Sequence, residues 1–323
     1  MKHQRNINIK TLIYTIIIGL LFSACSKTEK SSALKIENKM NKQTSKIINI
    51  DYLSVFYREA GDKNKETILL LHGFPSSSYM YSELINELSN NYHLIAPDYP
   101  GFGLSSAPTT SEFQYTFDNV AEITNKFIDK LELKNFYLLM QDFGGPVGFR
   151  IATKRPELIK GLIIQNANAY MEGLGEWPAR MKKMQQAEDF EGLQSFQKYL
   201  TSLEGIKEQH IGGAKNPATI DPSFYLMDHA FLSRNGALEI QKAMLADYGN
   251  NFPKYSEWQN YMETEQPKTL VVWGTNDKFF SKAGGEAYSK NLKNIETHFF
   301  EGSHFMLDEY SKEVAELITN FIN

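Results

Sequence analysis

Hydrophobic residues between positions 47 and 323 follow two patterns that alternate along the chain. Short, continuous apolar runs are typical of strands buried on both faces of a parallel sheet. Segments in which apolar residues recur every three or four positions are typical of amphipathic helices. The predicted strands lie at 67–71, 92–97, 136–140, 162–164, 269–273 and 297–300, after a β-rich stretch at 47–61. The predicted helices lie at 81–88, 117–131, 146–153 and 314–321.

The alternation of strands and helices across short turns predicts an α/β fold, with a mostly parallel sheet covered by helices on both faces. The alternation stops between about residues 168 and 266, where the chain is helical and rich in Met, Tyr and Gln. A helical insertion of this kind is expected to form a lid over the carboxyl ends of the strands, where such folds bind ligands. We therefore expect an α/β core from residues 47–167 and 267–323, and a helical lid from residues 168–266.

The first 25 residues have the composition of an export signal. Basic residues at the N-terminus lead into an apolar run at 11–22, which is followed by small residues and Cys25. The run is shorter than the roughly 20 residues that a membrane-spanning helix needs. The segment Leu21-Phe22-Ser23-Ala24-Cys25 resembles a bacterial lipobox, in which the cysteine is lipidated and becomes the mature N-terminus.

The lipobox resemblance implies a signal peptide at 1–24, a lipid anchor at Cys25 and a polar tether at 25–46. The protein is then expected to be an exported lipoprotein, held on a membrane of a bacterial cell envelope. The alternatives are an uncleaved anchor helix and a plain secretory signal. Cys25 is the only cysteine of the chain, which excludes an intramolecular disulfide and a cysteine-based zinc site.

The charge balance argues against nucleic acid as a partner. Lys and Arg number 34 against 38 Asp and Glu, which gives a formal net charge of −4. A nucleic-acid-binding protein needs an excess of basic residues to neutralise phosphates. The 42% hydrophobic content also excludes a disordered chain. The sequence therefore predicts a globular protein with no nucleic-acid partner.

Three residues with catalytic potential each directly follow a predicted strand: Asp142, Asp277 and His304. Taken singly they have ordinary interpretations, as a helix N-cap, a turn residue and a surface histidine. Their order along the chain, however, matches the nucleophile, acid and base order of one enzyme architecture. The carboxyl ends of parallel strands meet at one edge of a sheet, so these side chains are expected to lie together.

The chemistry of the set follows from its residue types. Asp142 lies between a strand and a helix and precedes Gly144 and Gly145, the small residues that a sharp nucleophile elbow requires. A carboxylate at the elbow can attack carbon and form an alkyl ester. His304 is the natural base near neutral pH, and Asp277 would fix its tautomer.

The chain from about 47 to 322 resembles the α/β-hydrolases, in the branch with an aspartate nucleophile that includes epoxide hydrolases and haloalkane dehalogenases. The segments that carry this resemblance are His72-Gly73-Phe74-Pro75, 98–105, Gln141-Asp142-Phe143-Gly144-Gly145, 274–277 and Gly302-Ser303-His304-Phe305. It implies that the backbone N–H groups of Phe74 and Phe143 form an oxyanion hole. It also implies a structural His72, a loop-bracing pair of Asp98 and Ser105, and no cofactor.

The two enzymes of this branch differ in how they stabilise the leaving group. Dehalogenases hold halide with N–H donors, typically a tryptophan directly after the nucleophile, and neither Phe143 nor Phe74 has a side-chain donor. Epoxide hydrolases protonate the opening oxygen with lid tyrosines, since a phenol keeps its proton at neutral pH. Tyr248 best resembles that tyrosine, with Tyr225 and Tyr170 as its candidate partners.

The sequence therefore predicts a hydrolase that opens epoxides through an alkyl-aspartate ester, with a small apolar substrate and water as reactants. Gln141 before the nucleophile favours the alternative, a haloalkane dehalogenase that would use other donors such as Trp177. An esterase is disfavoured because attack of Asp142 on an ester would give an anhydride. A non-catalytic, surface-displayed binding protein has no need of Asp142, Asp277 and His304 together.

Overall fold

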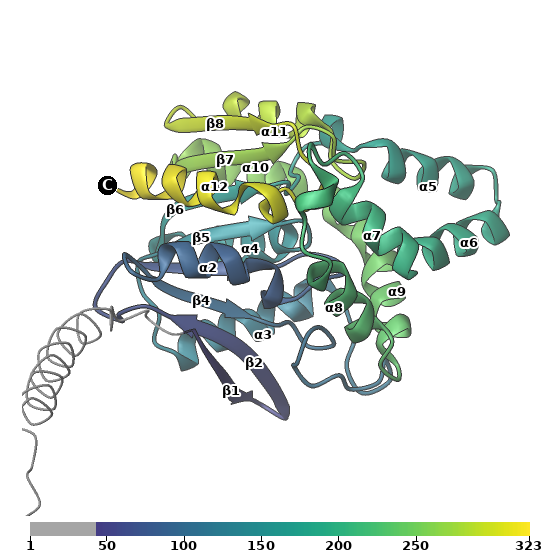
Figure 1. Ribbon diagram of the computed structural model, residues 1–323, viewed down its shortest axis with the longest axis horizontal. Coiled ribbons are helices and arrows are strands. Elements are labelled where there is room, and N and C mark those ends of the chain that lie inside the picture. Colours follow the sequence, from purple (N-terminus) through teal and green to yellow (C-terminus); the bar gives the residue numbers. More distant parts are fainter. Residues whose placement is uncertain (1–42) are drawn as a thin grey trace, which may run out of the picture. The chain divides into compact units, whose positions relative to one another are not determined.

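The computed structural model describes residues 43–323, and its centre is an eight-stranded sheet in the order β1-β2-β4-β3-β5-β6-β7-β8 (Figure 1). The strands are β1 Thr44–Ile50, β2 Leu53–Ala60, β3 Thr67–Leu71, β4 His93–Pro97, β5 Phe136–Gln141, β6 Ile159–Gln165, β7 Lys268–Gly274 and β8 Ile295–Phe300. β1 and β2 are antiparallel, as are β2 and β4, and all pairs from β4 to β8 are parallel. The predicted α/β class is confirmed.

The parallel strands in the middle of the sheet are mainly apolar because both of their faces are covered. Leu69 and Leu71 of β3 belong to one apolar cluster, whereas Ile68 and Leu70 belong to the cluster on the opposite face. Successive side chains of a strand point to opposite faces of a sheet, so a strand buried on both sides is apolar at most of its positions. All four side chains are fully buried.

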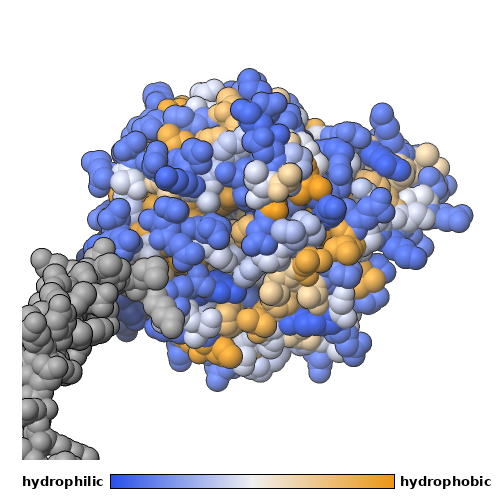
Figure 2. All heavy atoms as spheres, viewed as in Figure 1, coloured by the Kyte–Doolittle hydropathy of each residue, from blue (hydrophilic) through white to orange (hydrophobic). Residues whose placement is uncertain are grey.

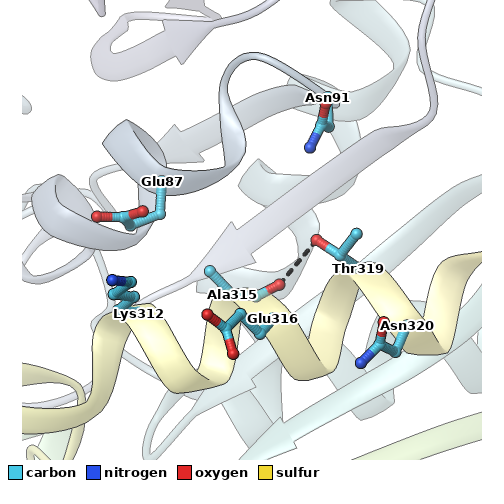
Figure 3. A pocket seen from close by; sticks show the side chains of 7 residues that line it. All are labelled: Glu87, Asn91, Lys312, Ala315, Glu316, Thr319 and Asn320. Carbon is cyan, nitrogen blue, oxygen red and sulfur yellow. Dashed lines mark hydrogen bonds between the residues drawn. The ribbon is translucent and has the colours of Figure 1, made fainter.

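Helices form a layer on each face of the sheet (Figure 1). α2 (Ser82–Leu88) and α12 (Leu307–Ile322) pack together on one face, and α3 (Phe117–Lys130) packs beside α4 (Gly144–Lys154) on the other. Between α2 and α12 is a hollow of about 440 Å³, where Glu87 of α2 faces Lys312 and Glu316 of α12 (Figure 3). The lining of this hollow has no nucleophile paired with a base, and it gives no reason to place chemistry there.

The chain between β6 and β7 is helical and adds no strand to the described sheet. Its helices are α5 Glu176–Gln186, α6 Phe190–Leu200, α7 Leu203–Ile211, α8 Ser223–Leu232, α9 Ala237–Asp247 and α10 Tyr255–Glu265. α5 to α9 lie together beyond one end of the strands (Figure 1), and apolar side chains gather on the surface over α8 and α9 (Figure 2).

The residues expected to form the lid, 168–266, belong to two parts of the molecule. α10 does not cover the strand ends but packs against α4, where the Trp258 ring stacks on Phe149 with centroids 5.3 Å apart. Gln259 of α10 also donates a hydrogen bond to the carbonyl of Ala169. The sequence pattern did not separate α10 from the lid because both are amphipathic helices.

The start of the folded part differs from the prediction by three residues. β1 begins at Thr44 rather than at 47, because Thr44, Ser45 and Lys46 pair with β2. The expected tether of 25–46 therefore overlaps the first strand. Cys25 and the predicted signal peptide lie outside the described residues. In the part of the chain that the structure describes, no helix has the length and apolar character needed to cross a membrane.

Candidate active site

Asp142 occupies a sharp turn between β5 and α4. Its backbone φ is +48°, a left-handed value that costs a non-glycine residue about 1–2 kcal/mol. Gly144 allows the turn to close: a Cβ at this position would lie 2.1 Å from the carbonyl oxygen of Leu71. The turn presents the Asp142 side chain at the carboxyl end of the sheet, beside the first turn of α4.

Met140 is bulkier than the residue expected on the strand side of such a turn, and Gly148 makes room for it. A Cβ at Gly148, one turn into α4, would lie 2.2 Å from the Met140 sulfur. Met140 itself is fully buried and keeps its register with Leu71 and Ile164 on the neighbouring strands. The elbow therefore accommodates a large residue without displacing the strand.

The structure brings Asp142, Asp277 and His304 together. His304 Nδ1 donates to Asp277 Oδ2 over 2.8 Å, and His304 Nε2 lies 3.8 Å from Asp142 Oδ2. The three side chains are almost completely buried. With Nδ1 carrying the proton toward Asp277, the lone pair of Nε2 faces the side of the ring on which Asp142 lies.

Asn166 also belongs to this group, although the sequence did not indicate it. It follows β6 directly, and its Nδ2 donates to Asp277 Oδ2 over 2.8 Å. The carbonyl of Asn166 accepts a hydrogen bond from the backbone N–H of Asp142 over 3.2 Å. The one available signal was its position after a predicted strand, which Asp142 and Asp277 share.

The second carboxylate oxygen of Asp277 is held by the backbone. Oδ1 accepts hydrogen bonds from the N–H groups of Phe279, at 2.7 Å, and Phe280, at 3.1 Å. Counting His304 and Asn166, Asp277 accepts four hydrogen bonds, and its orientation is fixed. These four donors hold the carboxylate in place beside the His304 ring.

The Asp142 carboxylate lies where an oxyanion would later form. The Phe74 N–H donates to Asp142 Oδ1 over 2.6 Å, and the Phe143 N–H also donates to this carboxylate. Burial raises the pKa of Asp142 to about 6, against the opposing effects of His304 and the two N–H groups. Two inward-facing N–H groups can hold the oxygen of a tetrahedral intermediate.

The charges around His304 set its pKa in the free protein. Burial lowers the pKa of His304, but the negative charges of Asp277 and Asp142 outweigh burial and raise the pKa above its usual value. The amide Nε2 of Gln141 lies 3.0 Å from His304 Nε2 and can donate to it when the ring is neutral. Gln141 is therefore in contact with the base rather than with the nucleophile alone.

The loops beneath the site are braced by His72, Asp98 and Ser105. His72 Nε2 accepts from the Tyr99 N–H, and burial lowers the pKa of His72 to about 4. Asp98 accepts from the N–H groups of Ser78 and Leu104, each over 2.7 Å. Ser105 Oγ donates to the carbonyl of Asp98 over 2.6 Å. These contacts hold backbone loops and leave no group free for catalysis.

Tyr248 is the lid tyrosine placed over the nucleophile. Its ring stacks on Phe143 at 6.0 Å between centroids, and on Phe280 at 6.4 Å. Its hydroxyl is buried and has no hydrogen-bond partner of standard geometry among the described residues. Burial, then Tyr255, then the charge of Asp142 raise its pKa well above the usual value. Tyr248 therefore carries a retained proton close to the nucleophile.

The partner of Tyr248 is Tyr255, not the two tyrosines suggested by the sequence. Tyr255 contributes to the raised pKa of Tyr248, and its own hydroxyl receives a hydrogen bond from Asn168. Tyr170 donates instead to Asn291, in the segment that precedes β8. Tyr225 faces His210, with ring centroids 6.2 Å apart. The prediction of Tyr170 and Tyr225 as partners was wrong because lid tyrosines look alike in sequence.

Trp177 is connected to the base, His304, through the ring of Phe279. It packs edge to face with Phe279 at 4.8 Å, and Phe279 contacts the His304 ring at 4.9 Å. Phe74 and Tyr248 pack against the ring of Phe143, the residue after the nucleophile. The walls around the nucleophile are thus mainly aromatic, which suits an apolar substrate. Within residues 43–323 no cluster of His, Cys, Asp or Glu is arranged to hold a metal ion.

A buried elbow nucleophile, an Asp–His pair on later strands and a helical lid define a hydrolase of the α/β-hydrolase fold. The family model for the alpha/beta hydrolase fold matches residues 66–310, so the chain belongs to this family. An uncharacterized hydrolase of Saccharomyces cerevisiae is 38% identical, over 83% of this chain and 93% of the yeast protein. The family resemblance predicted from the motifs is confirmed.

Other similar proteins carry different activities in their names. A cis-3-alkyl-4-alkyloxetan-2-one decarboxylase of Shewanella oneidensis is 27% identical, over 80% of this chain and 82% of that protein. Epoxide hydrolase 4 of Mus musculus is 28% identical, over 84% and 76% of the two chains. The solved haloalkane dehalogenase DatA of Agrobacterium tumefaciens superposes with a TM-score of 0.70 at 20% identity, covering 87% of this chain and 97% of that one.

Proposed function

We propose that this protein is an epoxide hydrolase that works through a covalent alkyl-aspartate ester. The observation that carries the proposal is the place of Tyr248, whose buried hydroxyl lies above Phe143 and is affected by the charge of Asp142. Opening an epoxide puts negative charge on an oxygen that must receive a proton. Tyr248 keeps its proton at neutral pH and lies on the lid side of the nucleophile.

The first step forms the ester. A carboxylate oxygen of Asp142 attacks an epoxide carbon, and the C–O bond of the ring breaks toward the oxygen. That oxygen takes the Tyr248 proton, which leaves a tyrosinate beside the Tyr255 hydroxyl. The product of this step is a β-hydroxyalkyl ester of Asp142. Attack at carbon, rather than at a carbonyl, is what a carboxylate nucleophile does well.

The second step hydrolyses the ester with His304 as base. His304 Nε2 takes a proton from water, and the hydroxide attacks Cγ of Asp142. The N–H groups of Phe74 and Phe143 hold the resulting oxyanion. Collapse of this intermediate breaks the ester bond, and the His304 proton goes to the departing alkoxide, which leaves as a diol. One carboxylate oxygen of Asp142 then comes from water. The second proton of that water, left on Asp142 when the intermediate collapses, goes to solvent, and Tyr248 takes one proton back from solvent, so one water is consumed and no net proton.

Alkylation itself prepares His304 for its role. The Asp142 charge is one of the effects that raise the pKa of His304 in the free protein. Esterification removes that charge, so the pKa of His304 falls at the step in which it must accept a proton. Asp277 continues to hold Nδ1. Formation of the ester therefore favours the neutral form of His304, the form that can act as the base in hydrolysis of that ester.

A haloalkane dehalogenase is the second candidate. It is favoured by Gln141, which contacts His304, and by Trp177, which lies one aromatic ring from the base. Against it, the residues beside the nucleophile, Phe74 and Phe143, have no side-chain N–H for a halide. A departing epoxide oxygen can instead use Tyr248.

The test is a substrate screen followed by trapping of the intermediate. The purified protein is given aryl and alkyl epoxides, bromoalkanes, and a dialkyl β-lactone of the type named in the Shewanella relative. Diol, bromide and carbon dioxide are measured. We expect diol, and His304→Gln should accumulate protein heavier by the mass of the epoxide. Rapid release of bromide without diol would favour the dehalogenase. No diol and no adduct from any epoxide would contradict the proposal.

We also propose that the protein is an exported lipoprotein anchored through Cys25. The support is the sequence Leu21-Phe22-Ser23-Ala24-Cys25 after a basic, apolar N-terminus. The expected result is partition of the full-length protein into detergent, with Cys25→Ala accumulating as a larger precursor. Identical processing of the parent and the variant would contradict it.

A further inference from the structure

His210 forms a buried ion cluster outside the residues assigned above. It lies in the last turn of α7, and its Nδ1 is 2.6 Å from Asp308 of α12, while Nε2 is 3.1 Å from Asp228 of α8. All three side chains are 1% exposed. Both ring nitrogens face a carboxylate, so the ring is held in one orientation and carries its charge. Burial lowers the pKa of His210, but the two carboxylates outweigh it and raise the pKa to about 9.

The cluster joins the lid to the base. α7 and α8 belong to the lid, whereas Asp308 lies in the first turn of α12 of the core, shortly after His304. Helix dipoles support the arrangement, because the imidazolium is at the C-terminus of α7 and Asp308 is in the first turn of α12. Ser76, just after Phe74, also donates to Asp228 over 2.9 Å.

Both neighbours of His304 in the chain are held by His210. Ser303 Oγ donates to the carbonyl of His210 over 2.6 Å. The Phe305 ring stacks face to face on the His210 ring, with centroids 4.0 Å apart and planes within 5°. The residues before and after the base therefore both contact His210, one through its backbone carbonyl and the other through its ring.

The neighbours of Asp277 are held by the same part of the lid. Asn276 donates from Nδ2 to the carbonyl of Gly213, two residues after α7, over 2.8 Å. Lys278 pairs with Glu208 of α7 at 2.5 Å. The two loops that carry the acid and the base are thus both attached to α7 and the turn that follows it.

We propose that His210 is a positioning residue for His304, fixing the base loop through Ser303 and Phe305. The proposal rests on the proposed function in that it assigns His210 to the second step, ester hydrolysis, and not to the attack by Asp142. His210 does not reach the nucleophile in any described contact, whereas it holds both residues flanking the base. Other charged or titratable groups around the cluster are His304 itself, Tyr225 and Glu309.

The experiment separates the two steps in His210→Gln. Single-turnover mixing with an epoxide, followed by intact-mass measurement, gives the rate of ester formation and the rate of its loss. We expect ester formation within about twofold of the parent and ester hydrolysis at least about tenfold slower, since small misplacement of a base is costly. Equal slowing of both steps, or no slowing of either, would overturn the proposal.

His93→Gln is the matched control. His93 is also a buried histidine on a carboxylate, with Nε2 3.1 Å from Glu59, but it starts β4 at the opposite end of the sheet. We expect this variant to keep the parent rates of both steps. If His210→Gln fails to fold, Asp308→Asn loosens the same cluster while keeping its shape, and we expect the same selective loss. Parent-like ester hydrolysis in a folded Asp308→Asn would then overturn the proposal.

A second readout does not need a substrate. Nitrogen-15 spectra of the histidine rings report the titration of His304 and its Nδ1 proton. We expect the Nδ1–H signal of His304 to weaken or shift in His210→Gln and to stay unchanged in His93→Gln. An unchanged His304 signal in folded His210→Gln overturns the proposal. Absence of turnover in the parent, together with a shifted signal, contradicts the proposed function and leaves the positioning role supported.

Discussion

Asn166 and His304 act on the same oxygen of Asp277. The Asn166 amide donates to Asp277 Oδ2 over 2.8 Å, and His304 Nδ1 reaches that oxygen over 2.8 Å. Asn166 also accepts a backbone hydrogen bond from Asp142, and its side chain exchanges two hydrogen bonds with the backbone of Gly274. This one residue therefore connects the nucleophile turn to the loop that holds the acid.

We predict that Asn166→Gly slows ester hydrolysis by about 10- to 100-fold, the effect of losing one hydrogen bond to a buried charge. Glycine preserves the left-handed backbone at this position, where φ is +40°. Ester formation should change much less, because Asp142 attacks without the base. Single-turnover mass measurement gives both rates. Asn125→Ala, at a buried amide in α3, is the control and should keep both rates.

Removing the Tyr248 hydroxyl should affect ring opening alone. We predict that Tyr248→Phe lowers the rate of ester formation from epoxides by on the order of 10²–10⁴-fold, with a smaller loss if Tyr255 shares the role. Hydrolysis of the ester should remain at the parent rate. Tyr170→Phe is the matched control, because its hydroxyl donates to Asn291. Full epoxide activity of Tyr248→Phe would reject the role given to this tyrosine.

At acidic pH, the rate of ester formation should follow the titration of Asp142. Only the carboxylate attacks carbon, and burial raises the pKa of Asp142 to about 6. The rate should therefore fall as the pH drops through about 6, reaching a tenfold loss per pH unit below it. Ester hydrolysis should lack this dependence, since Asp142 is then esterified and cannot titrate. Rapid mixing between pH 4.5 and 8 measures both, and a midpoint near 4 would disagree with a buried nucleophile.

The ion cluster around His210 should make the free energy of unfolding decrease as the pH becomes alkaline. The folded-state pKa of about 9 exceeds the unfolded value of 6.5, so the stabilisation is fully present below about 6.5 and is lost as the pH rises through 9. We predict that the difference in unfolding free energy between the parent and His210→Gln shrinks by at most about 3 kcal/mol from pH 6 to pH 10. Urea unfolding at several pH values measures it. A difference that stays constant would mean that His210 is not charged in the folded protein.

The sequence alone determined the fold class and the three central residues. Strands buried on both faces carry mainly apolar side chains, so they stand out as nearly continuous apolar runs such as the one at β5. Asp142 and Asp277 follow such runs, His304 follows the half-buried strand β8, and parallel strands bring their carboxyl ends to one edge of the sheet. These inferences use only neighbours along the chain.

The tertiary structure alone decided which residues support Asp142, Asp277 and His304. Asn166 reaches Asp277 because β6 and β7 lie side by side, although 102 residues separate the two strands. Tyr255 rather than Tyr170 or Tyr225 meets Tyr248, and α7, α8 and α12 bring His210 between Asp228 and Asp308. Helical periodicity says which face of a helix is buried but not which neighbour that face meets. Such contacts depend on how helices pack across the whole domain, and that packing leaves no local pattern in the sequence.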